Sequence, residues 1–297
     1  MLANMHLVLI SGLSGSGKSI ALKVLEDADY YCVDNLPAQL LQPLVGQLDL
    51  QGYDKVGVVI DIRGGNSVAT LPLQLDALRQ QDLELQFLFL DAQDATLIKR
   101  YSETRRRHPL ASDQLTLTEA IAAERGHLAG LWALGHHIDT SGVKPAALRE
   151  WVRQFVKSTI ASDPCRGLTL LFESFGFKNG LPLDADLVFD VRCLPNPHYD
   201  PNLRPLTGRD AAVVDFLEAE ADVLRMRSDI AHFVRAWLPA YVQDSRNYLT
   251  VAIGCTGGQH RSVYFAEWLA REFRDCARVL VRHRELAAPN PLPGSNP

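Results

Sequence analysis

Short apolar runs alternate with helix-like segments through the first half of the chain. Their length and β-branched content predict buried strands at Leu7–Ile10, Val56–Ile62, Leu85–Leu90 and, with a less regular pattern, Ala133–Asp139. Apolar residues at helical spacing predict helices at Lys18–Asp27, Leu71–Gln81 and Pro145–Thr159. Such alternation is typical of a mainly parallel sheet that is covered by helices.

A second series of elements follows the loop-like stretch Ser158–Gly167, where Pro164 and Gly167 break regular structure. The strands predicted beyond it are Leu168–Phe172, Leu187–Val191, Tyr248–Ile253 and Ala277–Val281. The helices predicted there are Ala211–Val242, which Pro239 can interrupt, and Ser262–Phe273. We therefore expect two α/β domains, one over 1–160 and one over 165–297.

Composition and net charge indicate the general class of protein but not the reaction or ligand. The chain has 297 residues, of which 47% are apolar and 22% charged, as in an ordinary globular protein. A net charge of −5 excludes a global cationic field for nucleic acid, although a local basic patch remains possible. Five cysteines without a CxxC pair argue for a reducing compartment. Without a signal peptide or a membrane-length apolar run, we expect a cytoplasmic protein.

The clearest motif lies between the first predicted strand and the first predicted helix. It matches the P-loop pattern G-x-x-x-x-G-K-[ST] at Gly12, Leu13, Ser14, Gly15, Ser16, Gly17, Lys18 and Ser19. The glycines let backbone N–H groups turn toward a phosphate, Lys18 reaches the terminal phosphates and Ser19 ligates Mg²⁺. A glycine-rich turn that binds nothing is the alternative, but both flanks fit the nucleotide site. We predict an ATP- or GTP-binding loop with Lys18 as a catalytic residue.

An acid at the end of a neighbouring strand would support the Mg²⁺. Asp61 follows the apolar run Val58–Ile60 and is our choice, both as a metal-supporting and as a catalytic residue. Asp91 ends an equally good run and is the competitor. Beyond it, Arg100 and Arg105–Arg107 could form a lid over the transferred phosphate, or a solvated basic surface.

A second glycine-rich loop, Gly254–Ser262, follows a predicted strand and opens a helix. It contains Cys-x₅-Arg-Ser, a spacing also found in cysteine phosphatases, where the arginine clamps the phosphate. We predict an anion site there and doubt that Cys255 is catalytic, because no general acid is evident. A tight turn with an inert cysteine is the alternative. The proline-rich loop Leu194–Gly208 carries His198, Asp200 and Arg204 and is a second candidate site builder.

These motifs together resemble the RapZ/YvcJ family of bacterial P-loop nucleotide-binding proteins. The segments that carry the resemblance are Gly12–Ser19, Tyr31–Pro37, Phe172–Lys178, Asp190–Arg192, Leu194–Pro201 and Gly254–Ser262. The similarity spans about Leu7 to Glu285. It implies an N-terminal domain similar to small kinases of the adenylate kinase type, binding of ATP and GTP with Mg²⁺, and weak ATPase and GTPase activity. It also implies a second nucleotide-associated segment formed by Asp61, Ile62, Arg63 and Gly64.

The resemblance further implies a regulatory, RNA-binding role. Enterobacterial family members present a small RNA to the endonuclease RNase E, and their C-terminal domain senses glucosamine-6-phosphate. This control adjusts the level of glucosamine-6-phosphate synthase. The family's sugar-phosphate ligands fall on Asp190, His198, Cys255, Thr256, Gly257, His260 and Arg261. We also expect a homo-oligomer with no membrane partner.

The end of the chain departs from the enterobacterial pattern, which closes on a Lys/Arg cluster used for RNA. Here Arg282–Pro289 runs into an uncharged tail. Since RNA contacts need cations that displace phosphate counterions, the adapter role is less favoured than the two phosphate sites. Four functions remain open: a regulatory NTPase, a small-molecule kinase, an RNA adapter and, as a minor alternative, a phosphatase.

Overall fold

The structure of the chain is a computed structural model that describes residues 5–62, 70–81, 83–112, 114–157, 168–243 and 248–286. The chain divides into two compact units, residues 1–160 and 161–297. The loop-like stretch Ser158–Gly167 and the segment Ala287–Pro297 lie outside the described residues, as do Arg63 and Gly64 of the predicted second nucleotide segment.

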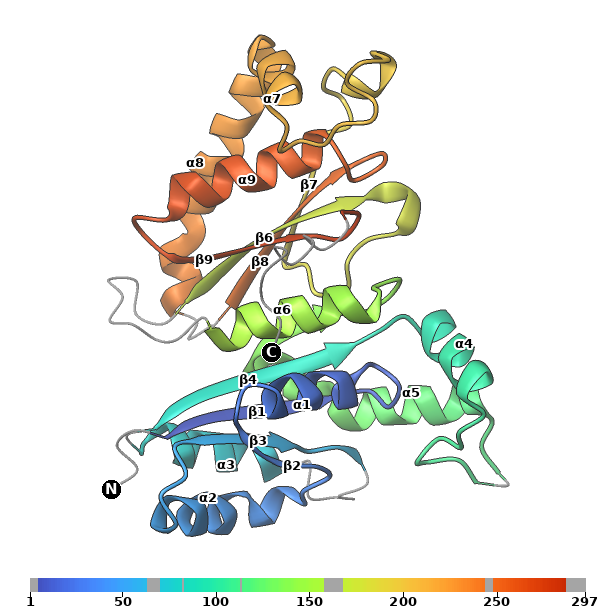
Figure 1. Cartoon of the computed structure of the whole chain (residues 1–297), viewed down its shortest axis with the longest axis vertical. Coiled ribbons are helices and arrows are strands. Elements are labelled where there is room, and N and C mark those ends of the chain that lie inside the picture. The colour runs from blue at the N-terminus through green and yellow to red at the C-terminus, as the bar shows by residue number, and fades with distance from the viewer. Residues whose placement is uncertain are drawn as a thin grey trace. The chain divides into compact units, whose positions relative to one another are not determined.

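The first unit is built on one parallel sheet with the strand order β2-β3-β1-β4-β5 (Figure 1). The strands are β1 His6–Gly12, β2 Tyr31–Val33, β3 Lys55–Val59, β4 Glu84–Asp91 and β5 His136–Asp139. The α-helices are α1 Lys18–Glu26, α2 Leu41–Leu50, α3 Leu71–Arg79, α4 Asp94–Thr104, α5 Leu117–Leu128 and α6 Pro145–Lys157. Short 3-10 helices η1 Ala38–Leu40 and η3 Ala129–Leu134 complete it. The prediction of a parallel sheet covered by helices is confirmed.

The register of this sheet brings three chain segments to one edge. β1 lies between β3 and β4, with Ile10 beside Val59 and Gly12 beside Leu90. Gly12 is required there, because a Cβ at this position would stand 2.0 Å from the carbonyl oxygen of Leu90. The loop after β1 therefore starts against the carboxyl end of β4, where ligands of parallel α/β sheets bind.

The second unit has its own parallel sheet, in the order β7-β8-β6-β9. Its strands are β6 Thr169–Gly176, β7 Leu187–Asp190, β8 Tyr248–Cys255 and β9 Arg278–His283. Its helices are α7 Ala211–Glu218, α8 Ala221–Gln243 and α9 Arg261–Phe273, with 3-10 turns η4 Phe177–Asn179 and η5 Pro197–Tyr199. Helix α9 packs against β6, β8 and β9 (Figure 1).

Each unit has a hydrophobic core of its own. In the first unit the buried cluster combines β1 and β4 side chains with α2, α3 and α5. In the second unit Phe172 of β6, Ile253 of β8 and Phe265 of α9 are fully buried. Within the described ranges, none of the helices has the length and apolar character needed to span a bilayer.

The structure corrects the expected helix in the second unit. The predicted Ala211–Val242 is two helices that are separated at Ala219–Glu220, and Pro239 lies inside α8. The sequence pattern also missed β2 and helices α2, α4 and α5.

Candidate functional site

The loop between β1 and α1 forms a tight cradle at the carboxyl edge of the first sheet. The backbone N–H of Ser16 donates to the Leu13 carbonyl at 3.0 Å, which closes a turn. Gly17 adopts φ +109° just before α1 begins at Lys18, so the chain swings sharply into the helix. The buried Lys18 side chain folds back, and its Nζ donates to the Gly12 carbonyl at 2.7 Å.

This cradle fits an anionic ligand. The Ser16 hydroxyl is fully buried and has no hydrogen-bond partner among the described residues. Gly15 and Gly17 donate their backbone N–H groups to no other part of the described chain. Buried polar groups without partners are rare in native structures, so a ligand that accepts hydrogen bonds is the natural complement. The positive end of the α1 dipole adds to this preference.

The outer side of the cradle is held by polar contacts from later elements. Arg100 of α4 donates from Nη1 to the Gly15 carbonyl at 2.9 Å and from Nη2 to the Thr140 carbonyl at 2.7 Å. The Thr140 hydroxyl, which follows β5, lies 2.9 Å from the Ser16 carbonyl. Burial lowers the pKa of Arg100. Arg100 therefore links the loop to the segment that follows β5.

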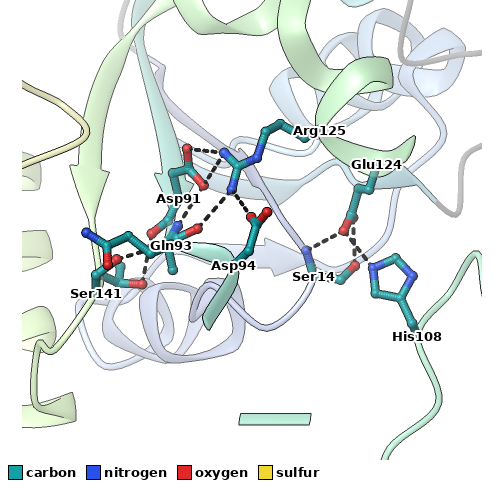
Figure 2. Close-up of polar contacts among 10 residues, drawn as sticks. Ser14, Asp91, Gln93, Asp94, His108, Glu124, Arg125 and Ser141 are labelled. Carbon is teal, nitrogen blue, oxygen red and sulfur yellow. Dashed lines mark hydrogen bonds and ion pairs between the residues drawn. The ribbon is translucent and has the colours of Figure 1, made fainter. Parts of the chain in front are cut away.

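A buried carboxylate on α5 holds the same loop from another side (Figure 2). The backbone N–H of Ser14 donates to Oε2 of Glu124 at 3.0 Å, and the Ser14 hydroxyl donates to Oε1 at 2.7 Å. His108 lies 3.0 Å from Oε2 through its Nε2. The side chains of both Glu124 and His108 are completely buried.

The two acids that compete for the metal have different surroundings. Asp91 receives two hydrogen bonds from Nη1 of Arg125, at 2.8 and 3.0 Å, and one from the Ala92 N–H (Figure 2). Burial raises the pKa of Asp91, and Arg125 offsets part of that rise. Asp61 is also buried and follows β3, where the Ile60 N–H donates to the Ile10 carbonyl. Asp61 thus lies two residues beyond β3 and Asp91 ends β4, the two strands that flank the loop strand, and Arg125 engages the Asp91 carboxylate.

The arginines Arg105–Arg107 follow α4 and are exposed. Arg105 ends the helix with φ +52°. Their exposure is compatible with a solvated basic surface and also with side chains that contact a bound nucleotide. The lid over the transferred phosphate therefore stays a prediction. No three His, Cys, Asp or Glu side chains gather into a metal site in the part of the chain that the structure describes. A Mg²⁺ ion here would rely on nucleotide phosphates as well as on Ser19 and Asp61.

In the second unit the loop Gly254–Ser262 is wrapped around a cysteine. The Gly258 N–H donates to Sγ of Cys255 at 3.2 Å, and the Ser262 hydroxyl lies 3.2 Å from the same sulfur. Burial raises the pKa of Cys255, but these hydrogen bonds and the nearby Arg261 outweigh it, so the pKa is lowered overall. Gly258 has φ +74°, a conformation that favours glycine.

Arg261 lies at the start of α9 and is 3% exposed. Its Nη1 donates to the Arg192 carbonyl at 2.9 Å and to the Leu194 carbonyl at 2.7 Å. Its Nε is buried and has no hydrogen-bond partner among the described residues. The guanidinium thus joins the loop to the segment after β7, and its buried Nε donor stays unused among the described residues.

The remaining predicted ligand residues lie around this loop. Asp190 pairs with Nη2 of Arg192 at 2.7 Å, which lowers the pKa of the carboxyl. His198 is exposed, and its ring centroid lies 6.2 Å from that of His260. Burial lowers the pKa of His260, whose Nε2 lies 3.2 Å from the Leu203 carbonyl. Thr256 is exposed and Gly257 partly so.

Sequence reasoning missed Glu124 and Thr140, which contact the first loop, and His108, which contacts Glu124. It also missed Arg125, which engages Asp91. One signal was available for Glu124. Thr116 and Glu119 form a capping box that starts α5, and Glu124 then falls on the same helix face as Ile121 and Leu128. An acid on the apolar face of a helix is unusual unless it has a buried partner.

Family models match both units. One described as "RapZ-like N-terminal domain" matches residues 5–159, and one described as "RapZ C-terminal domain" matches residues 168–287. A nucleotide-binding protein from Dechloromonas aromatica is 64% identical over 95% of this chain and 99% of its own length. A second, from Azoarcus sp., is 62% identical over 95% of this chain and 96% of its own.

Solved structures also align with part of the chain. A sugar kinase from Janibacter sp. HTCC2649 is 16% identical, with 52% of this chain and 95% of that chain covered and a TM-score of 0.37. A similarity at this level says nothing about the substrate.

Proposed function

This chain belongs to the RapZ family, and we propose that it is a regulatory protein that binds ATP and GTP and slowly hydrolyses them. Its relatives are named nucleotide-binding proteins, and the loop between β1 and α1 is where a nucleotide would bind. The observation that carries the proposal is the buried, unpartnered Ser16 hydroxyl inside a P-loop whose outer side is fully braced.

In this proposal each side chain has a defined task. The ammonium of Lys18, which rests on the Gly12 carbonyl, moves to the terminal phosphates and offsets the charge that develops there. Ser19 and Asp61 hold the Mg²⁺–nucleotide complex, which supplies charge neutralisation between the phosphates. Arg63 and Gly64 are proposed to extend this segment.

The first test combines binding with hydrolysis. Mg·ATP and Mg·GTP should each raise the melting temperature of the parent protein, because a ligand at 100 times its Kd stabilises the fold by about 2.7 kcal/mol. Lys18→Ala should lower hydrolysis at least about a hundredfold, since the lysine acts on transition-state charge. Circular dichroism provides the fold control. A well-folded Lys18→Ala protein with parental turnover would contradict the assignment.

We further propose that the second loop senses a sugar phosphate, most simply glucosamine-6-phosphate. The unused Nε of Arg261 and the backbone turn around Gly257 and Gly258 support a phosphate there. Asp190 would accept the cationic amino group of the sugar, in competition with Arg192. His198, His260, Thr256 and Cys255 complete the proposed set.

A role as an RNA-binding RNase adapter, with a small RNA and RNase E as partners, has weaker support. Arg282 is buried, and the mostly buried Arg284 lies 3.9 Å from Glu173 and 4.0 Å from Asp184. These two arginines point into an acidic interior instead of a phosphate backbone. Salt-dependent binding of a structured RNA would support the adapter role, and turnover stimulated by a small acceptor would support a kinase.

A further inference from the structure

The side chain of Glu124 is completely buried and ionisable, which is expensive unless its contacts require a carboxylate. A leucine of similar size would fill the same space at lower cost. Three donors converge on the carboxylate: the Ser14 N–H, the Ser14 hydroxyl and the ring of His108 (Figure 2). Its contacts with the nucleotide loop, rather than packing, account for its presence.

The hydrogen bonds around His108 fix which way it points. The Leu110 N–H donates to Nδ1 of His108 at 3.1 Å, so Nδ1 acts as an acceptor and the ring proton is on Nε2. Nε2 therefore donates to Oε2 of Glu124, the same oxygen that accepts the Ser14 N–H. His108 directly follows Arg105–Arg107, so this one carboxylate also ties the arginine-rich segment to the loop.

The contacts of Ser14 show what this arrangement does for the loop. Its N–H and hydroxyl both point to α5, while the turn from Leu13 to Ser16 brings Gly15 and the Ser16 hydroxyl to the cradle. Pinning the outer half of the loop fixes the direction of the donors in its inner half. We propose that Glu124, oriented by His108, is a positioning residue that presets the loop for the nucleotide phosphates. The inference rests on the proposed nucleotide site.

Glu124 is not placed to act on the substrate itself. Both of its oxygens accept hydrogen bonds from protein donors, and no part of the side chain reaches solvent. A general base needs to reach the proton that it removes, so the role of Glu124 is indirect.

Three variants distinguish the contacts of Glu124 with the loop from its negative charge and from the stability of the first unit. Glu124→Ala removes all three contacts. Glu124→Gln can keep all three: its amide oxygen accepts the two N–H groups, and its amide nitrogen donates to the Ser14 hydroxyl. Gln86→Ala is the matched control, because Gln86 is a buried polar residue of the same unit that joins His6 to the Phe155 carbonyl, on the amino-terminal half of β4.

The measurements are the Kd of a non-hydrolysable Mg·ATP analogue, kcat for hydrolysis and the melting temperature. We expect Glu124→Ala to raise Kd about tenfold and to lower kcat about 10- to 100-fold, since small misplacements of binding groups have effects of that size. In Glu124→Gln and Gln86→Ala, Kd and kcat should stay within about threefold of the values for the parent protein. Gln86→Ala should lower the melting temperature about as much as Glu124→Ala does.

Three results would overturn the proposal. Unchanged Kd and kcat in Glu124→Ala would show that the loop holds itself. If Gln86→Ala weakened nucleotide binding and lowered kcat as much as Glu124→Ala does, the effect would come from stability alone. If Glu124→Gln weakened binding and lowered kcat as much as Glu124→Ala does, the role would belong to the negative charge. If the parent binds the analogue without hydrolysing nucleotide, only the hydrolysis proposal fails and Kd decides the role of Glu124. If the parent binds no nucleotide, both proposals fail.

Discussion

Asp61 lies just beyond β3 and Asp91 is the last residue of β4, on either side of β1. The Asp91 carboxylate is engaged by Arg125 and by the Ala92 N–H. We therefore expect Asp61→Asn to raise the Mg²⁺ concentration that hydrolysis requires. Asp91→Asn should instead lower the free energy of unfolding by about 1–3 kcal/mol, with solvent screening of the partly exposed Arg125 favouring the lower end, because it weakens the hydrogen-bonded pair that the buried Asp91 forms. Mg²⁺ titrations of turnover and urea unfolding of both variants separate the two roles. A higher Mg²⁺ requirement in Asp91→Asn alone would reverse the assignment.

Glu267 makes the second unit sensitive to acid. Its hydrogen bond from His283 is the largest cause, with Arg209 at 2.6 Å as a further one, of a pKa lowered to about 2 despite partial burial. Since the folded-state pKa lies below the ordinary 4.5, the folded protein binds fewer protons than the unfolded chain between these values. This contribution to stability is complete above about pH 4.5 and is lost as the pH falls toward 2.

The pH dependence of unfolding tests this pair. Glu267→Gln should flatten the loss of stability between pH 4.5 and 2, relative to the parent protein, in urea unfolding followed at each pH. Glu272→Gln is the matched control, because Glu272 is on the same helix and pairs with Arg235 at the surface. An equal flattening by the control would show that Glu267 has no special role. Solvent screening keeps the effect modest, since Glu267 is partly exposed.

At the level of elements, the sequence predicted the strands better than the helices. Runs such as Leu85–Leu90 are apolar on both faces because the strand is covered by helices on both sides, and this pattern is unmistakable. Helix α4 has only Leu97 and Tyr101 buried, and the apolar face of α5 is interrupted by Glu124, so neither shows a regular stripe. The break between α7 and α8 at Ala219–Glu220 contains no glycine or proline, so the sequence pattern did not predict it.

The candidate site was predictable to the same uneven degree. The loop Gly12–Ser19 is contiguous, so its motif and its flanks identify it from sequence alone. Glu124, Arg100 and Thr140 reach that loop from positions 85 to 124 residues away, and only the parallel sheet brings them together. The engagement of the Asp91 carboxylate depends on Arg125, a contact that no local pattern contains.

Helix α9 offers a test of the second loop, because two of its arginines differ in burial. Arg261 is buried with an unused Nε, whereas Arg271 is exposed and its Nε only reaches the Glu267 carbonyl of its own helix. Loss of a hydrogen bond to a charged group costs about 1.5–3 kcal/mol, so Arg261→Ala should weaken glucosamine-6-phosphate binding about tenfold or more. Calorimetry should show parental affinity in Arg271→Ala. Equal affinities in both variants would make Gly254–Ser262 a structural turn.

For the molecule as a whole, the separate cores carry a consequence for folding. Among the residues that the structure describes, the buried cluster of the first unit lies between Met5 and Leu131, and that of the second lies between Leu168 and Ala277. Each sheet is complete within its own unit, and all of its strand pairs are internal. Each unit is also longer than the lower limit at which a single core can sustain a fold.

We therefore expect residues 1–160 and 161–297, expressed as separate fragments, to fold independently. Each fragment should unfold cooperatively in urea and show the circular dichroism of an α/β protein. The first fragment should be stabilised by Mg·ATP, and the second by glucosamine-6-phosphate, in thermal-shift measurements, because each proposed site draws its residues from one unit. Lys18→Ala and Arg261→Ala fragments control for non-specific anion binding. A fragment that unfolds without a cooperative transition would show that its core depends on the other unit. Such a fragment would contain every strand and helix of its own sheet, and these elements would not be enough to stabilise the fold.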